Sequence, residues 1–149
     1  MSNESTLTHS PTVPGPHALT ERAKQVLSIE MEGIAAVRDR LDDHTPDAPL
    51  LRALHMLVTC TGRVVVTGIG KSGLVGRKLA ATFSSTGTPA FFLHPVEGAH
   101  GDLGSIRDTD VILAISNSGE TAELNAVLPA MKSLGAGIIA LPGGMPSTL

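Results

Sequence analysis

The sequence predicts an α/β fold in which helices sandwich a parallel β-sheet of the flavodoxin- or Rossmann-like kind, preceded by two amino-terminal helices. Three observations predict it. Short continuous apolar runs, typical of buried parallel strands, occur at 63–67, 90–93, 110–115 and 137–141. Segments with helical periodicity lie between them, so strand and helix alternate. Glycine-bearing turns follow the first and third runs, at the strand ends where such sheets bind ligands.

Two helices are expected before the sheet. Apolar residues recur at helical spacing over 18–43, with charged residues between them and Thr20 as the expected N-cap. A second helix is expected over 48–60. Residues 1–17 are rich in Ser, Thr and Pro and are expected to form a disordered tail, so that the domain occupies 18–149.

Strand and helix then alternate along the chain. The turn 68–73 leads into an expected helix over 74–85, and residues 94–104 are expected to form a loop with at most one helical turn. A further helix is expected over 121–134, where Gly135 takes the position that ends a helix. Nothing after the fourth strand would cover that flank of the sheet, so the domain is expected to be truncated at its carboxyl end.

The segment after the third strand has the composition of a phosphate-binding loop. It reads Ser116-Asn117-Ser118-Gly119-Glu120-Thr121 and leads into a helix. Helix amino termini carry unpaired N–H groups and partial positive charge, which a phosphate group satisfies, and nearby hydroxyls add donors. An ordinary helix cap at Ser118 is the simpler alternative. Three hydroxyls and an amide around one glycine exceed what a cap needs, which favours phosphate binding.

The turn after the first strand matches two nucleotide-binding motifs in part. Gly68, Gly70 and Gly73 have the dinucleotide-binding spacing, but the second strand ends without the acidic residue that would hold a ribose. A P-loop would need glycine where Val65 stands. Lys71 lies between two of the glycines at a strand end, which favours a cation beside a bound phosphate over a solvated loop lysine.

Titratable groups concentrate between residues 94 and 104. His100 is flanked by small residues and suits proton transfer near neutral pH, although a single histidine is more often structural. Glu123 lies in the first turn of the helix after the phosphate loop, where it either complements the helix dipole or acts as a carboxylate near the substrate. The spacing matches no zinc pattern, so no metal site is predicted.

The composition narrows the function classes. The chain has 149 residues, 42% of them hydrophobic and 2% aromatic, with a net charge of −3 and no basic cluster, so no nucleic-acid partner is predicted. Cys60 is the single cysteine, which excludes a disulfide framework. The sequence shows neither a secretory signal nor an apolar run long enough for a membrane span, so a cytoplasmic location and no membrane partner are expected.

The motifs together resemble a known family. The stretches GIGKSG, HPVEGAHGDLG and ISNSGET resemble the sugar isomerase (SIS) domain and, more narrowly, the arabinose-5-phosphate isomerases, over about residues 23–140. The resemblance implies interconversion of D-arabinose 5-phosphate and D-ribulose 5-phosphate through an enediol, without a cofactor, for 3-deoxy-manno-octulosonate synthesis. It also implies a homo-oligomer, commonly a tetramer.

The resemblance implies roles for eight residues. Those that would hold the phosphate are Ser72, Ser116, Ser118 and Thr121, with Asn117 beside them. Those that match active-site positions of the family are Lys71, His100 and Glu123. The family's remaining catalytic Glu and His would lie beyond Leu149, as would its CBS domains, and Val96 and Pro142 depart from the family's pattern. A non-catalytic sugar-phosphate sensor therefore remains an alternative to the isomerase, and a dinucleotide-dependent oxidoreductase is a third hypothesis.

Overall fold

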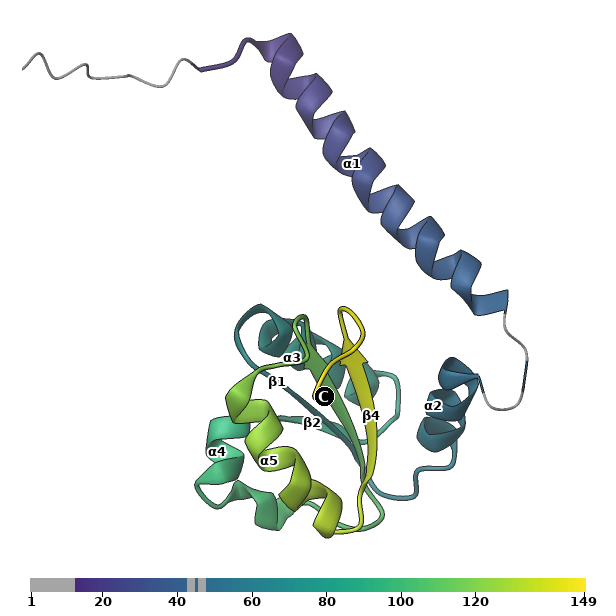
Figure 1. The fold of residues 1–149 in the computed structure, drawn as a ribbon, viewed down its shortest axis with the longest axis vertical. Helices are drawn as coiled ribbons and strands as arrows, with labels where there is room; N and C mark the ends of the chain where they lie inside the picture. Colours follow the sequence, from purple (N-terminus) through teal and green to yellow (C-terminus); the bar gives the residue numbers. More distant parts are fainter. Residues whose placement is uncertain (1–12, 43–44, 46–47) are drawn as a thin grey trace, which may run out of the picture. The chain divides into compact units, whose positions relative to one another are not determined.

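The structure is a computed structural model that describes residues 13–42, 45 and 48–149. The chain divides into two compact units, Met1–Thr45 and Pro46–Leu149 (Figure 1). Most of the expected amino-terminal tail, residues 1–12, lies outside the described residues. Among the helices that the structure describes, none combines the length and apolarity needed to cross a membrane.

The first unit contains the long helix α1 (Pro16–Asp39) and the short 3-10 helix η1 (Arg40–Asp42). Helix α1 begins at Pro16, a residue well suited to the first helical position because it needs no acceptor for an N–H. The prediction that Thr20 is the N-cap is wrong: Thr20 lies inside the helix, and its hydroxyl donates to the Pro16 carbonyl at 3.0 Å. No described residue of α1 is buried within this unit.

The second unit is built on a four-stranded parallel sheet, as predicted. Its strands are β1 (Val64–Gly68), β2 (Ala90–Leu93), β3 (Val111–Ser116) and β4 (Gly137–Pro142). Their order in the sheet is β2-β1-β3-β4, and every neighbouring pair is parallel. All four apolar runs therefore form strands, and β1 and β3 occupy the centre.

Helices connect these strands. They are α2 (Pro49–Val58), α3 (Gly70–Ser85), α4 (Pro95–Ala99), the 3-10 helix η2 (Asp102–Ser105) and α5 (Ala122–Ser133). Helix α3 begins at Gly70 rather than near residue 74, because Gly70 adopts a φ of +59° that completes the turn at once. Gly135, with a φ of +88°, follows the end of α5 as predicted.

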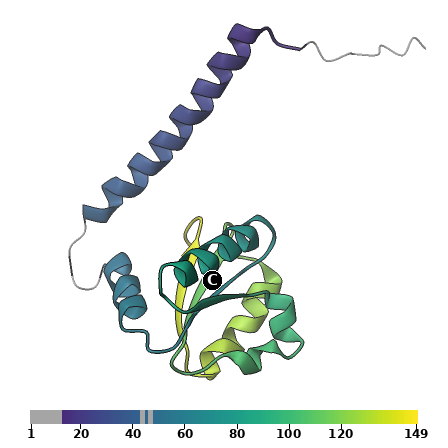
Figure 2. The same ribbon diagram turned by 180° about the vertical axis from the view of Figure 1, so that it is seen from behind.

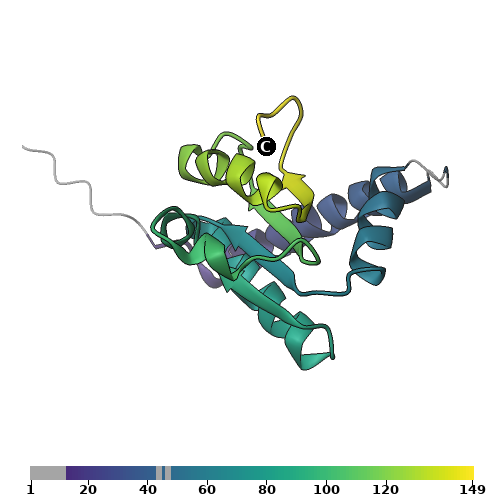
Figure 3. The ribbon, with the colours of Figure 1, turned by 90° about the horizontal axis from the view of Figure 1, so that it is seen from below.

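Each face of the sheet has its own hydrophobic core. On one face, Val65 of β1 and Ile112 of β3 pack with Val127 and Met131 of α5. On the other face, the alternate strand residues pack with Ala80 of α3 and with residues of α2. Figure 1 shows α4 and α5 in front of the sheet, Figure 2 shows α3 on the opposite side, and Figure 3 shows the sheet between α5 and α3.

The topology places a ligand-binding crevice between β1 and β3. The chain moves outward from β1 through α3 to β2 in one direction, and from β3 through α5 to β4 in the other. Because crossovers are right-handed, the two helices lie on opposite faces and their connections part above the central strands. Gly68 pairs with Ile115 in the ladder, so β1 and β3 end at the same level.

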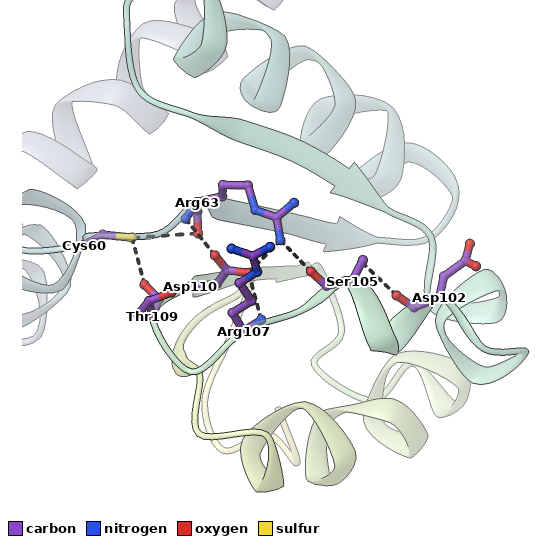
Figure 4. A network of polar contacts seen from close by, with 7 residues as sticks. All are labelled: Cys60, Arg63, Asp102, Ser105, Arg107, Thr109 and Asp110. Carbon is purple, nitrogen blue, oxygen red and sulfur yellow. Dashed lines mark hydrogen bonds and ion pairs between the residues drawn. The ribbon is translucent and has the colours of Figure 1, made fainter.

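A polar network closes the opposite, amino-terminal edge of the sheet (Figure 4). The buried Asp110 carboxylate accepts hydrogen bonds from the backbone N–H groups of Arg63, at 2.8 Å, and Arg107, at 3.0 Å. The Arg63 guanidinium reaches the same carboxylate at 3.1 Å, donates to the Ser105 carbonyl and stacks over the Phe91 ring. This network stabilises the fold at the edge remote from the strand ends where ligands bind.

Candidate functional site

A cleft of about 440 Å³ opens at the carboxyl ends of the central strands. It is lined by Lys71, Ser72, Val75, Ile115, Ser116, Asn117, Leu141, Pro142 and Gly143. Four residues that the sequence singled out therefore meet in one place: Lys71, Ser72, Ser116 and Asn117. They come from segments that follow β1 and β3, at the switch point of the topology.

The first turn of α3 forms one side of the cleft. Its earliest backbone hydrogen bond runs from the Gly73 N–H to the Ile69 carbonyl at 3.2 Å, and no side chain caps the helix. The N–H groups of Lys71 and Ser72 precede that bond and have no acceptor within the helix. Lys71 is exposed and forms no salt bridge with any residue that the structure describes. Unpaired donors and a free ammonium group make this side suited to an anion.

The loop 116–121 forms the second side, and its hydroxyls set its shape. The Ser116 hydroxyl is buried, accepts from the Gly119 N–H at 3.0 Å and shares a hydrogen bond with the Thr121 hydroxyl at 2.9 Å. Ser118 accepts from the Glu120 N–H at 3.1 Å. The interpretation of Ser118 as a helix cap is wrong, because the N-cap of α5 is Thr121 and its side chain makes no capping bond.

The third side of the cleft was not anticipated from the sequence. Pro142 ends β4 opposite Ser116, and the Gly143 N–H donates to the Ser116 carbonyl at 3.2 Å and the Asn117 carbonyl at 3.1 Å. A Cβ on Gly143 would lie 2.5 Å from the Asn117 carbonyl oxygen, so only glycine fits. The Pro-Gly-Gly turn was the available signal, but its place beside the loop depends on the pairing of β4 with β3.

The structure does not bring His100 and Glu123 into this cleft. His100 is the C-cap residue of α4, and Glu123 lies in the first turn of α5. Both are exposed, and neither lines the cleft. Within the described ranges, no group of three or more His, Cys, Asp or Glu residues is arranged to hold a metal ion.

The three glycines of the dinucleotide-like motif have structural explanations. A Cβ on Gly68 would lie 2.8 Å from the Ile115 carbonyl oxygen, and one on Gly73 would lie 2.8 Å from the Gly68 carbonyl oxygen. Gly70 supplies the positive φ of the turn. The motif therefore packs α3 tightly against β1 and β3, and its presence requires no pyrophosphate ligand.

The comparisons with known proteins agree with this geometry. A model of the SIS domain matches residues 57–149, which include all four strands and the whole cleft. The chain belongs to the SIS domain family. Its SIS domain is 46% identical over 129 residues to "Arabinose 5-phosphate isomerase KdsD" of Salmonella typhi and 45% identical to the protein of the same name in Escherichia coli K12. Each match covers 87% of this chain and 38% of the relative.

A solved structure shares the fold as well as the sequence. The SIS domain superposes on c3406 of E. coli CFT073 in complex with arabinose 5-phosphate with a TM-score of 0.77, at 42% identity, covering 90% of this chain and 69% of that one. The predicted fold class and the resemblance to this family are thereby confirmed. The chain spans about 38% of the length of the curated relatives that it matches.

Proposed function

We propose that this SIS domain binds a sugar phosphate in the cleft between α3 and the loop 116–121, and that the protein interconverts D-arabinose 5-phosphate and D-ribulose 5-phosphate. The observation that carries the proposal is the meeting of Lys71, Ser72, Ser116 and Asn117 at the switch point. The choice of sugar is supported by relatives named arabinose 5-phosphate isomerase and by a related structure that contains arabinose 5-phosphate.

The phosphate is assigned to the cleft floor. Its oxygens would accept hydrogen bonds from the N–H groups of Lys71 and Ser72 and from side chains of the loop, while the Lys71 ammonium balances the charge. Ser116 is placed to orient the site through its bonds to Gly119 and Thr121. Ser118 and Thr121 are proposed to complete the hydroxyl set around the same loop.

The reaction that we assign needs no electron acceptor. A base removes the proton from C2 of the aldose while the C1 oxygen gains one, which forms the enediol. Proton delivery to C1 and loss of the proton from the C2 oxygen then produce the ketose. Such a step requires an acid, a base and a group that stabilises the developing oxyanion. Lys71 is proposed to stabilise that charge, and His100 and Glu123 to position hydroxyls or transfer protons.

A non-catalytic sugar-phosphate sensor is the second candidate. It is favoured by one observation: His100 and Glu123 lie outside the lining of the cleft, which leaves the cleft of this chain with a cation and hydroxyls but no base. The remaining proposals concern the whole protein. We place it in the cytoplasm, in 3-deoxy-manno-octulosonate synthesis, and as a homo-oligomer, with a tetramer as the expected form.

Two measurements on the chain test these proposals. Because a ligand that binds only the folded state raises stability, arabinose 5-phosphate is expected to raise the melting temperature while NAD(H) leaves it unchanged. Conversion of arabinose 5-phosphate to ribulose 5-phosphate is then followed by NMR. A melting shift without conversion supports the sensor, and a shift with NAD(H) alone supports the oxidoreductase. No shift with arabinose 5-phosphate would contradict the proposed binding site.

A further inference from the structure

We propose that Glu120 is a positioning residue for the sugar-phosphate cleft: its carboxylate ties the segment 143–149 to the loop 116–121 and so holds the cleft wall in place. The inference rests on the proposed function and adds a residue to it. Glu120 follows the phosphate loop's glycine, and sequence reasoning treated it as a solvent-facing side chain.

Both oxygens of the Glu120 carboxylate are engaged by one residue. Oε1 accepts from the Thr148 N–H at 2.7 Å, and Oε2 accepts from the Thr148 hydroxyl at 2.6 Å. The Leu149 N–H donates to the Gly119 carbonyl at 3.0 Å beside them. The Thr148 hydroxyl and N–H hold the pKa of Glu120 below its ordinary value, so the group is a carboxylate at neutral pH.

The tied segments are in close backbone contact. Gly119 has a φ of +70°, and a Cβ there would lie 2.3 Å from the Cβ of Ser147. At the other end of the segment, the Gly143 N–H bonds to the carbonyls of Ser116 and Asn117. The wall of the cleft is therefore anchored to the loop at two points, one through Gly143 and one through Glu120.

The geometry favours positioning over direct contact with the ligand. Glu120 does not line the cleft, and its oxygens are already occupied by Thr148. A carboxylate would also repel a phosphate dianion, so a direct contact would weaken binding. Glu120 therefore acts through the wall: without its bonds, Pro142 and Gly143 are held only at the β4 end, and the position of Asn117 is less well defined.

The test compares variants of the full chain by calorimetric titration with arabinose 5-phosphate. Glu120→Ala removes both bonds and is expected to weaken binding about five- to tenfold, as loss of charge-assisted hydrogen bonds implies. Glu120→Gln can accept from the Thr148 N–H and donate to its hydroxyl, so it should restore most of the affinity. Thr148→Val should resemble Glu120→Ala more than Thr148→Ser does. Glu32→Ala, at an exposed glutamate of α1, serves as the control.

Hydrogen exchange on the free protein separates failure of this inference from failure of the proposed function. In Glu120→Ala, the amides of Thr148 and Leu149 should exchange faster, while those of β1 and β3 keep their protection. Unchanged exchange there, or wild-type affinity for arabinose 5-phosphate in Glu120→Ala, overturns the inference. If wild type itself does not bind arabinose 5-phosphate, the proposed ligand is wrong. Faster exchange would then support only the structural tie, and the role in positioning the site would be rejected with the ligand.

Discussion

Arg63 and Asp110 join the starts of the two central strands, although 47 positions separate them in the chain. The Arg63 N–H donates to Asp110 Oδ1 at 2.8 Å, and its guanidinium lies 3.1 Å from Oδ2 (Figure 4). The carboxylate is fully buried, so its charge is compensated almost entirely by these bonds and by the Arg107 N–H. Strand pairing at the amino edge of the sheet therefore depends on one acidic side chain.

Asp110→Ala is expected to destabilise the second unit strongly. The change leaves the N–H groups of Arg63 and Arg107 without their acceptor, which costs about 2–4 kcal/mol. Urea denaturation followed by circular dichroism measures the free energy of unfolding. Asp108→Ala, at an exposed neighbour, is the matched control and should stay within about 0.5 kcal/mol of wild type. Equal stability of the two variants would show that the network is not stabilising.

Asp110 also makes stability depend on pH. Burial alone would raise the pKa of Asp110, but the hydrogen bonds from Arg63 and Arg107 and the Arg63 charge outweigh it and hold that pKa below its ordinary value of 3.8. The unfolded state therefore binds the proton more readily than the folded state. The stabilisation is complete above about pH 3.8 and is lost as the pH falls through the folded pKa.

Asp110→Asn tests this pH dependence. Since the variant cannot titrate at this position, the stability difference between wild type and variant should be constant from about pH 6 to about pH 4 and narrow below that. Urea midpoints measured at small, regular steps of pH follow it. A difference that stays constant down to the lowest pH at which both proteins fold would contradict the assigned pKa direction.

Lys71→Ala is expected to weaken binding of arabinose 5-phosphate by at least about tenfold, because it removes a cation beside a bound dianion. In a full-length protein that is active, it should also abolish turnover. Lys78→Ala is the control, since Lys78 is an exposed lysine of the same helix whose ammonium donates to Thr82 at 3.2 Å. Calorimetric titration checks the affinities. Wild-type affinity in Lys71→Ala would remove Lys71 from the site.

Neighbouring glycines in the cleft wall should respond differently to alanine. A Cβ on Gly143 would strike the Asn117 carbonyl oxygen at 2.5 Å, whereas one on Gly144 would meet nothing within 4 Å. Gly143→Ala should therefore displace the loop and reduce the affinity for arabinose 5-phosphate several-fold, by about 1 kcal/mol or more. Gly144→Ala should bind like wild type. Similar affinities of the two variants would argue against a wall formed by Gly143.

Gly73→Ala should lower stability by about 1–3 kcal/mol, because the added Cβ would lie 2.8 Å from the Gly68 carbonyl oxygen, a backbone atom that cannot easily move. Gly104→Ala, with open space around its Cβ, is the control. Thermal and urea denaturation both measure the change. A stable Gly73→Ala protein would mean that the glycine motif is not needed for packing α3 on the sheet.

Local patterns were sufficient to predict much of the fold and part of the site. Continuous apolar runs marked all four strands, and the turn residues marked the ends where Lys71 and Ser116 lie. The prediction of Thr20 as a cap was wrong because Pro16 starts the helix earlier. Helix α4 fell in a segment expected to be mostly loop, since five residues are too few to show a helical period.

The sequence by itself determined the alternation of strand and helix, the glycine turns and the family, because each depends on residues close together in the chain. Only the tertiary structure decided the strand order, the pairing of Arg63 with Asp110, and the packing of Thr148 on Glu120. The two side-chain pairings join segments 28 or more residues apart. They depend on how the β-strands align and on which side chains can share one space, and no local pattern contains that information.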